Sequence, residues 1–127
     1  MKEELVRRNC QIDFAQLKGI LPYGIVPCDI DGVIEINGNF LFIETKFGPI
    51  DMPRGQKLMY EHLSRMPNTT VVLVAVKEKQ TSIGLYHFDP THWKFIIDGN
   101  HTDWTKCDYD KFVDFYKKWF DEMKTRR

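Results

Sequence analysis

An Asn-Gly dipeptide between two β-rich segments is the feature that most constrains how this chain can fold. Residues 30–36 and 40–47 are rich in Ile, Val and Phe, and Asn37-Gly38-Asn39 separates them. A type I′ turn requires positive φ at both central positions, and Asn-Gly adopts this turn more readily than other pairs do. The sequence therefore predicts a tight antiparallel hairpin at this point.

Three helices are expected around the hairpin. The first, at residues 2–10, is short and polar. The second covers residues 53–66, because Pro53 suits a first helical turn and Pro67 ends the pattern. The third covers residues 108–123. Helical spacing gives the second helix an apolar face of Leu58, Met59, His62, Leu63 and Met66, and the third helix one of Tyr109, Phe112, Val113, Tyr116, Phe120 and Met123.

The remaining segments predict strands and a loop. Residues 69–76 form a continuous β-branched run, which is typical of a strand buried on both faces. Two shorter strands are expected at 82–88 and 93–97, and Gly and Pro break segment 18–29 into a loop. The order of elements indicates one α/β domain over residues 1–127, with a mixed central sheet flanked by helices.

Composition narrows the class of protein. The chain has 127 residues, 43% of them hydrophobic, which is enough for a single domain with a real core. Its formal net charge is zero, which argues against a protein that coats nucleic acid through bulk charge. The three cysteines are scattered, and no run is long enough to span a membrane, so we expect a soluble, cytoplasmic protein with reduced thiols and no membrane partner.

Two acids and a lysine interrupt the apolar hairpin near its open end. Asp31 precedes the first strand, and Glu44-Thr45-Lys46 lies at the end of the second. Because residues two apart in a strand share a face, Glu44 and Lys46 project together. Pairing the strands symmetrically about Gly38 places Thr45 opposite Asp31. The hairpin is therefore expected to bring Asp31 beside Glu44.

This arrangement predicts a particular chemistry. Two converging carboxylates repel each other unless a cation joins them, and Mg²⁺ or Mn²⁺ prefers such oxygen ligands. A lysine beside the metal can orient the attacking water and offset charge that develops on a phosphate. The alternative interpretation of Asp31, Glu44 and Lys46 is a surface salt bridge.

The hairpin and the helix after it resemble the PD-(D/E)XK nuclease superfamily. Asp31 matches the first acid of the signature, and Glu44-Thr45-Lys46 matches its Glu-x-Lys. Gln56 and Tyr60 fit the Gln-x-x-x-Tyr element of RecB-type nuclease domains. The resemblance covers about residues 28–76 and implies a restriction-endonuclease-like core of the α-β-β-β-α-β type. The usual Pro-Asp is Pro27-Cys28-Asp29 here, so Asp29 remains an alternative to Asp31.

The resemblance also implies a set of roles. Asp31, Glu44 and the backbone carbonyl of Thr45 would hold Mg²⁺, with Mn²⁺ as a substitute, and Lys46 would position or activate the attacking water. The substrate would be DNA, and Gln56 and Tyr60 would support the site from the helix. Small stand-alone members of the family come from phages, mobile elements or DNA-repair systems. We expect such a small domain to dimerise or to join a larger complex in order to cut two strands.

Three questions stay open at the level of sequence. Arg54 and Lys57 either contact phosphates or belong to a solvated helix face. A Glu from the first helix is a metal ligand in some branches of the family, but nothing aligns Glu3 or Glu4 with it. The main functional alternative is a catalytically silent nuclease-fold module that binds nucleic acid or a protein. A third possibility is an interaction protein without a nucleic-acid role.

Overall fold

The predicted hairpin is present and forms one edge of the sheet. A computed structural model describes residues 13–80, 84 and 86–126. In it, β1 (Gly32–Ile36) and β2 (Asn39–Phe47) pair antiparallel across a turn in which φ is 52° at Asn37 and 81° at Gly38. Both central residues therefore have the positive φ that Asn-Gly was expected to supply.

The register of the hairpin differs by one residue from the expected one. Gly32 lies opposite Ile43 and Ile36 opposite Asn39, so the pairing is centred between Asn37 and Gly38. A two-residue loop closes the hairpin, and Asn39 is already the first residue of β2. Continuing this register places Asp31, rather than Gly32, across from Glu44.

The six strands form one mixed sheet in the order β1-β2-β3-β4-β5, with β6 also pairing to β4. Helix α2 (Arg54–Ser64) joins β2 to β3 (Thr69–Gln80), which are parallel, as a crossover helix allows. Residues 71–75 of β3 are buried, so the prediction of a central strand buried on both faces is confirmed. The chain is thus an α/β fold with a six-stranded mixed sheet.

The two short strands predicted at 82–88 and 93–97 are one long strand. β4 (Tyr86–Ile97) pairs with β3 from Tyr86 to Ile96. Pro90 lies between the two predicted strands, and proline cannot donate to a strand ladder. The register shift between Ala75 and Val76 absorbs the interruption, since Val76 pairs with Pro90 and Ala75 with His92. Two further short strands, β5 (Asn100–His101) and β6 (Thr105–Lys106), were not predicted.

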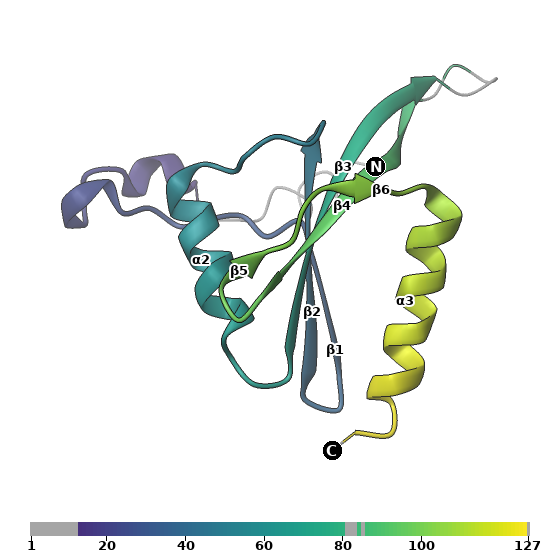
Figure 1. Ribbon diagram of the computed structural model, residues 1–127. Coiled ribbons are helices and arrows are strands. Elements are labelled where there is room, and N and C mark those ends of the chain that lie inside the picture. Colours follow the sequence, from purple (N-terminus) through teal and green to yellow (C-terminus); the bar gives the residue numbers. More distant parts are fainter. Residues whose placement is uncertain (1–12, 81–83, 85, 127) are drawn as a thin grey trace, which may run out of the picture.

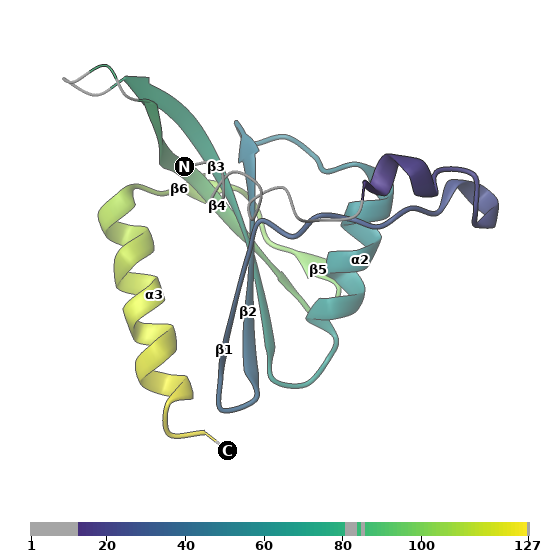
Figure 2. The same ribbon diagram turned by 180° about the vertical axis from the view of Figure 1, so that it is seen from behind.

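A helix covers each face of the sheet, as Figures 1 and 2 show from opposite sides. One core lies between the sheet and α3 (Tyr109–Met123), and its buried members are Leu41, Val72, Val74, Trp119 and Met123. The second core lies between the sheet and α2, and its buried members are Met52, Tyr60, Val71, Leu73 and Ile96.

The face that α3 turns to the sheet is only partly the expected one, since Phe112 and Met123 belong to the core as predicted. Phe112, Phe115 and Trp119 pack on the sheet, whereas Tyr109, Tyr116 and Phe120 are exposed. Both sets repeat at helical spacing, so periodicity alone could not choose between them. Trp119 and Phe115 bury large rings, while the tyrosines keep their hydroxyl groups in water.

The segment before β1 contains no strand over residues 13–31, in agreement with the predicted loop. It forms two short 3₁₀ turns, Phe14–Leu17 and Pro22–Gly24, and extends beyond α2, away from the sheet (Figures 1 and 2). The helix predicted at 2–10 lies outside the described residues. None of the helices in the described part of the chain is long and apolar enough to cross a membrane.

Candidate functional site

Asp31 directly precedes the first residue of β1 and is hydrogen-bonded to the end of β2. Its Oδ2 accepts hydrogen bonds from the backbone amide and the hydroxyl of Thr45, each at 2.9 Å. The predicted approach of Asp31 to this end of the hairpin is therefore confirmed. Asp29 is exposed, and no hydrogen bond joins it to β2 among the residues that the structure describes.

Glu44 is the buried centre of the site. Its exposed fraction is 3%, although it carries a carboxylate in the middle of a sheet. Oε1 accepts a hydrogen bond of 2.7 Å from Nε2 of Gln56, and Oε2 accepts one of 2.8 Å from the hydroxyl of Tyr60. Nζ of Lys46 lies 3.6 Å from Oε1, on the same face of β2. We call Asp31, Glu44, Lys46, Gln56 and Tyr60 the Glu44 cluster.

Helix α2 turns polar groups toward the sheet, which corrects the apolar face expected from its sequence. Gln56, Tyr60 and Ser64 follow one another at helical spacing, and Tyr60 is completely buried. His62, Leu58 and Met66 are exposed instead. The reason is Glu44, because burying a carboxylate without hydrogen-bond donors would destabilise the folded protein by roughly several kcal/mol. The helix supplies two donors and packs Met59 and Leu63 beside them.

The pKa values of the Asp31 and Glu44 carboxyl groups are shifted in opposite directions. Burial raises the pKa of Asp31, but the two hydrogen bonds from Thr45 and the charge of Lys46 outweigh it, so the pKa lies below the usual 3.8. Burial raises the pKa of Glu44 above the usual 4.5, and the negative charge of Asp31 adds to this, against the hydrogen bond from Tyr60 and the charge of Lys46. Such a divergence is typical of two carboxyls that share a small site.

Tyr60 remains a donor at every pH at which the protein would work. Burial raises the pKa of its hydroxyl well above the usual 10, and the neighbouring Glu44 carboxylate raises it further. The hydroxyl therefore stays protonated and keeps Glu44 in one orientation.

The oxygen set of the site fits a magnesium ion. No group of three or more His, Cys, Asp and Glu side chains suited to a metal occurs in the described ranges, so the side-chain ligands here would be Asp31 and Glu44. Mg²⁺ is commonly held by one or two carboxylates plus waters and substrate phosphates. Each Glu44 oxygen accepts one hydrogen bond from the α2 donors, and Oε1 also lies 3.6 Å from Nζ of Lys46; a carboxylate oxygen has two lone pairs with which to accept or to bind a cation. Oε1 of Gln56 is buried beside them without a hydrogen-bond partner.

Arg54 and Lys57 are not part of the Glu44 cluster. They lie on α2 and line a hollow of about 390 Å³ together with Asp51, Met52, Leu58 and Glu61. Neither makes an ion pair with Asp31 or Glu44 within the described ranges. Both cations nevertheless lie in the first turns of the helix that carries Gln56 and Tyr60.

Lys94 is a charged residue near the site that was not singled out from the sequence. Leu73 pairs with Glu44 on one side and with Lys94 on the other, so Glu44 and Lys94 lie in one row on the same face of the sheet. Lys94 is 7% exposed, and its Nζ lies 5.1 Å from the centroid of the Trp104 ring. Burial lowers its pKa, and Lys57 lowers it too, whereas Asp51 and Glu61 oppose the shift. A lysine inside the apolar run WKFII was the available signal.

Comparison of the chain with protein-family models, with curated proteins and with solved structures found no match. The function of the Glu44 cluster is therefore inferred from its own residues.

Proposed function

We propose that this protein is a Mg²⁺-dependent nuclease that hydrolyses DNA phosphodiester bonds. The observation that carries the proposal is the environment of Glu44, a buried carboxylate beside Asp31 and Lys46 that α2 holds through two hydrogen bonds. A structural salt bridge would not need a buried acid with a raised pKa, two dedicated donors and a second acid next to it.

Each residue of the cluster has a role in this proposal. Asp31, Glu44 and the backbone carbonyl of Thr45 would hold the metal. When bound, Mg²⁺ supplies positive charge that stabilises the charge developing on the phosphate. Lys46, partly exposed and 3.6 Å from Glu44, orients the attacking water and contacts a phosphate oxygen. Gln56 and Tyr60 keep the Glu44 carboxylate in one orientation, and are positioning residues.

The fold proposal is a restriction-endonuclease-like core of the PD-(D/E)XK type. The order β1-β2-α2-β3, with β2 and β3 parallel and the acids at one end of the hairpin, supports it. In the described part of the chain two strands precede α2, one fewer than in the α-β-β-β-α-β pattern. The acids and the lysine nonetheless occupy the expected end of the hairpin.

Arg54 and Lys57 would contact phosphates outside the reacting group. Both lie on α2, which also carries Gln56, so a DNA backbone that enters the cluster passes near the start of this helix. One cluster per chain cuts one strand, and cutting a duplex would require a dimer or a larger complex.

One observation favours the second candidate, a catalytically silent module with a nuclease fold. Both oxygens of Glu44 already accept hydrogen bonds, and burial favours the neutral form of this carboxyl. A site of this kind could persist as a structural network that binds nucleic acid or a protein without cleaving DNA.

A cleavage assay separates the candidates. Linear, circular, single-stranded and branched DNA are incubated with the protein and Mg²⁺ or Mn²⁺, with and without a chelator. We expect cleavage that the chelator abolishes and that Glu44→Ala and Lys46→Ala reduce by about 100-fold or more. Glu122→Ala and Lys118→Ala, which change the same residue types on the exposed side of α3, serve as controls.

The other outcomes are equally specific. Binding of DNA without cleavage under either metal would favour the silent module. Neither DNA binding nor metal uptake in calorimetry would favour an interaction protein without a nucleic-acid role.

A further inference from the structure

Lys94 is a buried lysine that the proposed function leaves without a role. Strand alternation in β4 turns Trp93 and Phe95 toward Phe115 of α3 and therefore turns Lys94 to the α2 side of the sheet. Its exposed fraction is 7%. No hydrogen bond or ion pair joins its ammonium group to another residue in the described ranges. A buried ammonium group without a paired anion destabilises a protein, so a ligand explains this lysine better than packing does.

The ammonium group of Lys94 lies beside a hollow at the start of α2, which we call the Lys57 hollow. The hollow has a volume of about 390 Å³ and is lined by Asp51, Met52, Arg54, Lys57, Leu58 and Glu61. Burial lowers the pKa of Lys94, and the charges that also act on it belong to three of these lining residues, Asp51, Lys57 and Glu61.

The Lys94 ammonium group also keeps contact with solvent. Among the residues that the structure describes, Oε1 of Gln56 is the one side-chain nitrogen or oxygen that is enclosed without a hydrogen-bond partner. Nζ of Lys94 has no such partner either and is not enclosed in this way. It therefore reaches solvent near the lining of the Lys57 hollow.

The hollow has an excess of unpaired positive charge. Glu61 is already bonded to His101 of β5, with 2.7 Å between Oε2 and Nε2. Asp51 is the other acid of the lining. Three cations on or beside the lining make no ion pair within the described ranges, namely Arg54, Lys57 and Lys94. An anionic ligand would balance this charge.

The beginning of α2 favours an anion as well. The N-cap residue is Pro53, which makes no side-chain hydrogen bond to the first amides, and the first turn contains no acid. Arg54 and Lys57 instead place positive charge near the positive end of the helix dipole, which lowers stability. A bound anion would offset this unfavourable charge.

We propose that Lys57 and Lys94 together hold one backbone phosphate of the substrate strand, beside the phosphate that reacts at the Glu44 cluster. The proposal rests on the proposed nuclease function and deepens it, because it makes Lys94 a residue that positions the strand. Since Lys94 shares the phosphate of Lys57, it adds no further phosphate contact. Arg54, exposed at the first position of α2, contacts a neighbouring phosphate.

The geometry of the sheet allows one strand of DNA to contact both places. Glu44 and Lys94 flank Leu73 in one row, on the same face of the sheet. Neighbouring strands lie about 4.8 Å apart, so the backbones of these two residues are roughly 10 Å apart. Contacts to phosphates fix the register of a nucleic acid without reading its sequence. A phosphate held by Lys57 and Lys94 would therefore direct the next part of the strand to Glu44.

Binding of DNA in a chelator tests the role of Lys94 without cleavage. The whole protein is titrated against labelled single-stranded and duplex oligonucleotides, and affinity is read by fluorescence anisotropy. Lys94→Met keeps the length of the side chain but removes its charge, and we expect about 10-fold weaker binding. Lys118→Met, at an exposed position of α3, should bind as the wild type does. Lys94→Met should unfold at the same or a higher temperature, because it removes an unpaired buried charge.

Double variants test whether the two lysines share one phosphate. Lys57→Ala/Lys94→Met should lose less affinity than the product of the two single losses, because each single variant already weakens the same contact. Lys46→Ala/Lys94→Met should lose the full product, because Lys46 contacts a different phosphate.

The failure of this proposal differs from that of the proposed function. Unchanged affinity in Lys94→Met, a full product of losses in Lys57→Ala/Lys94→Met, or a clearly lower unfolding temperature of Lys94→Met would overturn the phosphate site. Cleavage by the wild type under Mg²⁺ would then still support the nuclease. Coupled losses without any cleavage under Mg²⁺ or Mn²⁺ would support the phosphate site and overturn the nuclease. A wild type that binds no DNA would overturn both.

Discussion

Burial of Glu44 lowers the stability of the folded protein at neutral pH, although the proposed function requires this carboxylate. Burial raises its pKa, and the hydrogen bond from Tyr60 and the charge of Lys46 only partly oppose that. The folded protein therefore holds the Glu44 proton more tightly than the unfolded chain does. As pH rises from the usual value of 4.5 through the raised pKa, the free energy of unfolding falls. At neutral pH the ionised carboxylate is a cost that a bound cation would offset.

This cost predicts that Glu44→Gln is more stable than the wild type at pH 7 in a chelator. The amide is neutral, and its oxygen accepts from the Tyr60 hydroxyl. Its nitrogen takes the place of Oε1, which faces Nε2 of Gln56, so the Gln56 amide must turn over and present its unpartnered Oε1 as the acceptor. We expect a gain of about 1 kcal/mol in the free energy of unfolding, a few degrees in Tm, measured by thermal and urea denaturation.

The gain should disappear near pH 4, where the wild-type carboxyl is protonated as well. Glu122→Gln, at an exposed position of α3, should change stability little at either pH. A wild type that is more stable than Glu44→Gln at pH 7 without metal would contradict the assigned burial cost.

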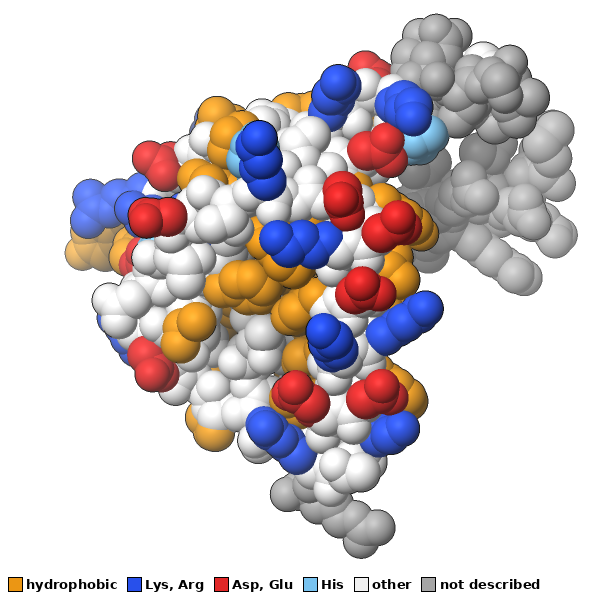
Figure 3. All heavy atoms as spheres, turned by 45° about the vertical axis from the view of Figure 1, so that its right-hand side comes forward, with side chains coloured by type: hydrophobic (Ala, Val, Ile, Leu, Met, Phe, Trp, Pro, Cys, Tyr) orange, Lys and Arg blue, Asp and Glu red, His pale blue; other side chains and the backbone are white. Residues whose placement is uncertain are grey.

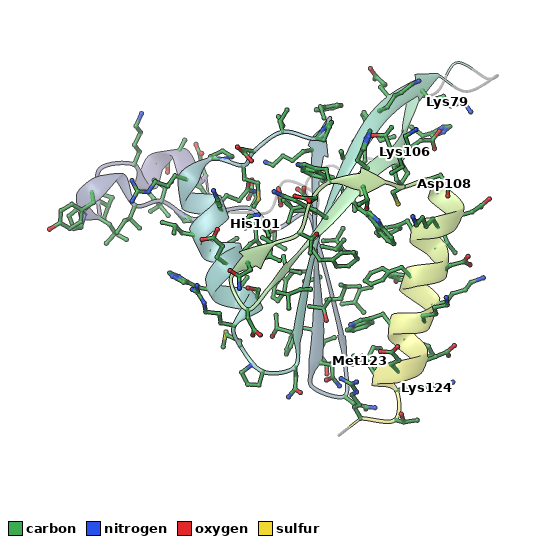
Figure 4. The ribbon with its side chains drawn as sticks, viewed as in Figure 1. Lys79, His101, Lys106, Asp108, Met123 and Lys124 are labelled. Atoms are coloured by element: carbon green, nitrogen blue, oxygen red, sulfur yellow. The ribbon has the colours of Figure 1, made fainter. Side chains whose placement is uncertain are left out.

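At the level of elements, the hairpin turn and the end of α3 stabilise each other. Nδ2 of Asn37 donates to the backbone carbonyl of Lys124 at 2.8 Å and lies 3.4 Å from that of Met123. Met123 and Lys124 lie beside this end of the hairpin (Figure 4). The carbonyl of Met123 also accepts from the backbone amide of Arg126, whereas the carbonyl of Lys124 has no partner within the helix and is satisfied by Asn37. One side chain thus serves both the turn and the helix.

Substitution of Asn37 separates these two roles. Asn37→Gly retains the positive φ that the turn requires but removes the amide that reaches α3. We expect a loss of about 1 kcal/mol in the free energy of unfolding and faster hydrogen exchange in the last turn of α3, while β1 and β2 stay protected. Denaturant titration and amide exchange measure the two effects.

Asn68→Gly is the matched control. Asn68 also has positive φ, 60°, and its side chain makes no hydrogen bond within the described ranges. It should be neutral or slightly stabilising, because glycine relieves the backbone cost. A loss in Asn37→Gly no larger than that in Asn68→Gly would mean that the bond to α3 contributes nothing.

On the scale of the whole molecule, charge is balanced and finely mixed. The formal net charge is zero. Lys, Asp and Glu side chains alternate on the face shown in Figure 3, with apolar side chains between them. Such a surface produces no strong field over the molecule. DNA binding would depend on a few local cations, namely Lys46, Arg54 and Lys57.

This charge distribution predicts a weak dependence of DNA affinity on salt. Each contacted phosphate contributes a little under one unit to the slope of log affinity against log salt, so three cations give a slope of about −2 to −3. The slope is measured by fluorescence anisotropy in a chelator over roughly 50 to 200 mM salt. Arg54→Ala and Lys57→Ala should each reduce it by about 1, whereas Lys118→Ala should not. A slope steeper than about −6 would mean a broad basic surface.

Local chemistry allowed much of the structure to be predicted from sequence. The turn at Asn37-Gly38 requires positive φ, and few residue pairs supply it as readily. The β-branched run of β3 suits only a strand between two packed layers. Glu44, Lys46 and Tyr60 could likewise be singled out, because charge within apolar runs and the spacing on a helix are visible in the sequence itself.

Contacts between distant segments decided the rest. The sequence allowed an alternative equally well for each of three features. These are the register of the hairpin, which could shift by one residue, the inner faces of α2 and α3, and the continuity of β4 past Pro90. Two stripes of one helix have the same period, and only the surface opposite selects between them. The side of α2 that faces the sheet is the polar one because it supplies hydrogen-bond donors to the buried Glu44. β4 continues past Pro90 because it pairs with β3 on both sides of the proline. The sequence by itself therefore determined which residues could form a site, and the tertiary structure determined which of them meet.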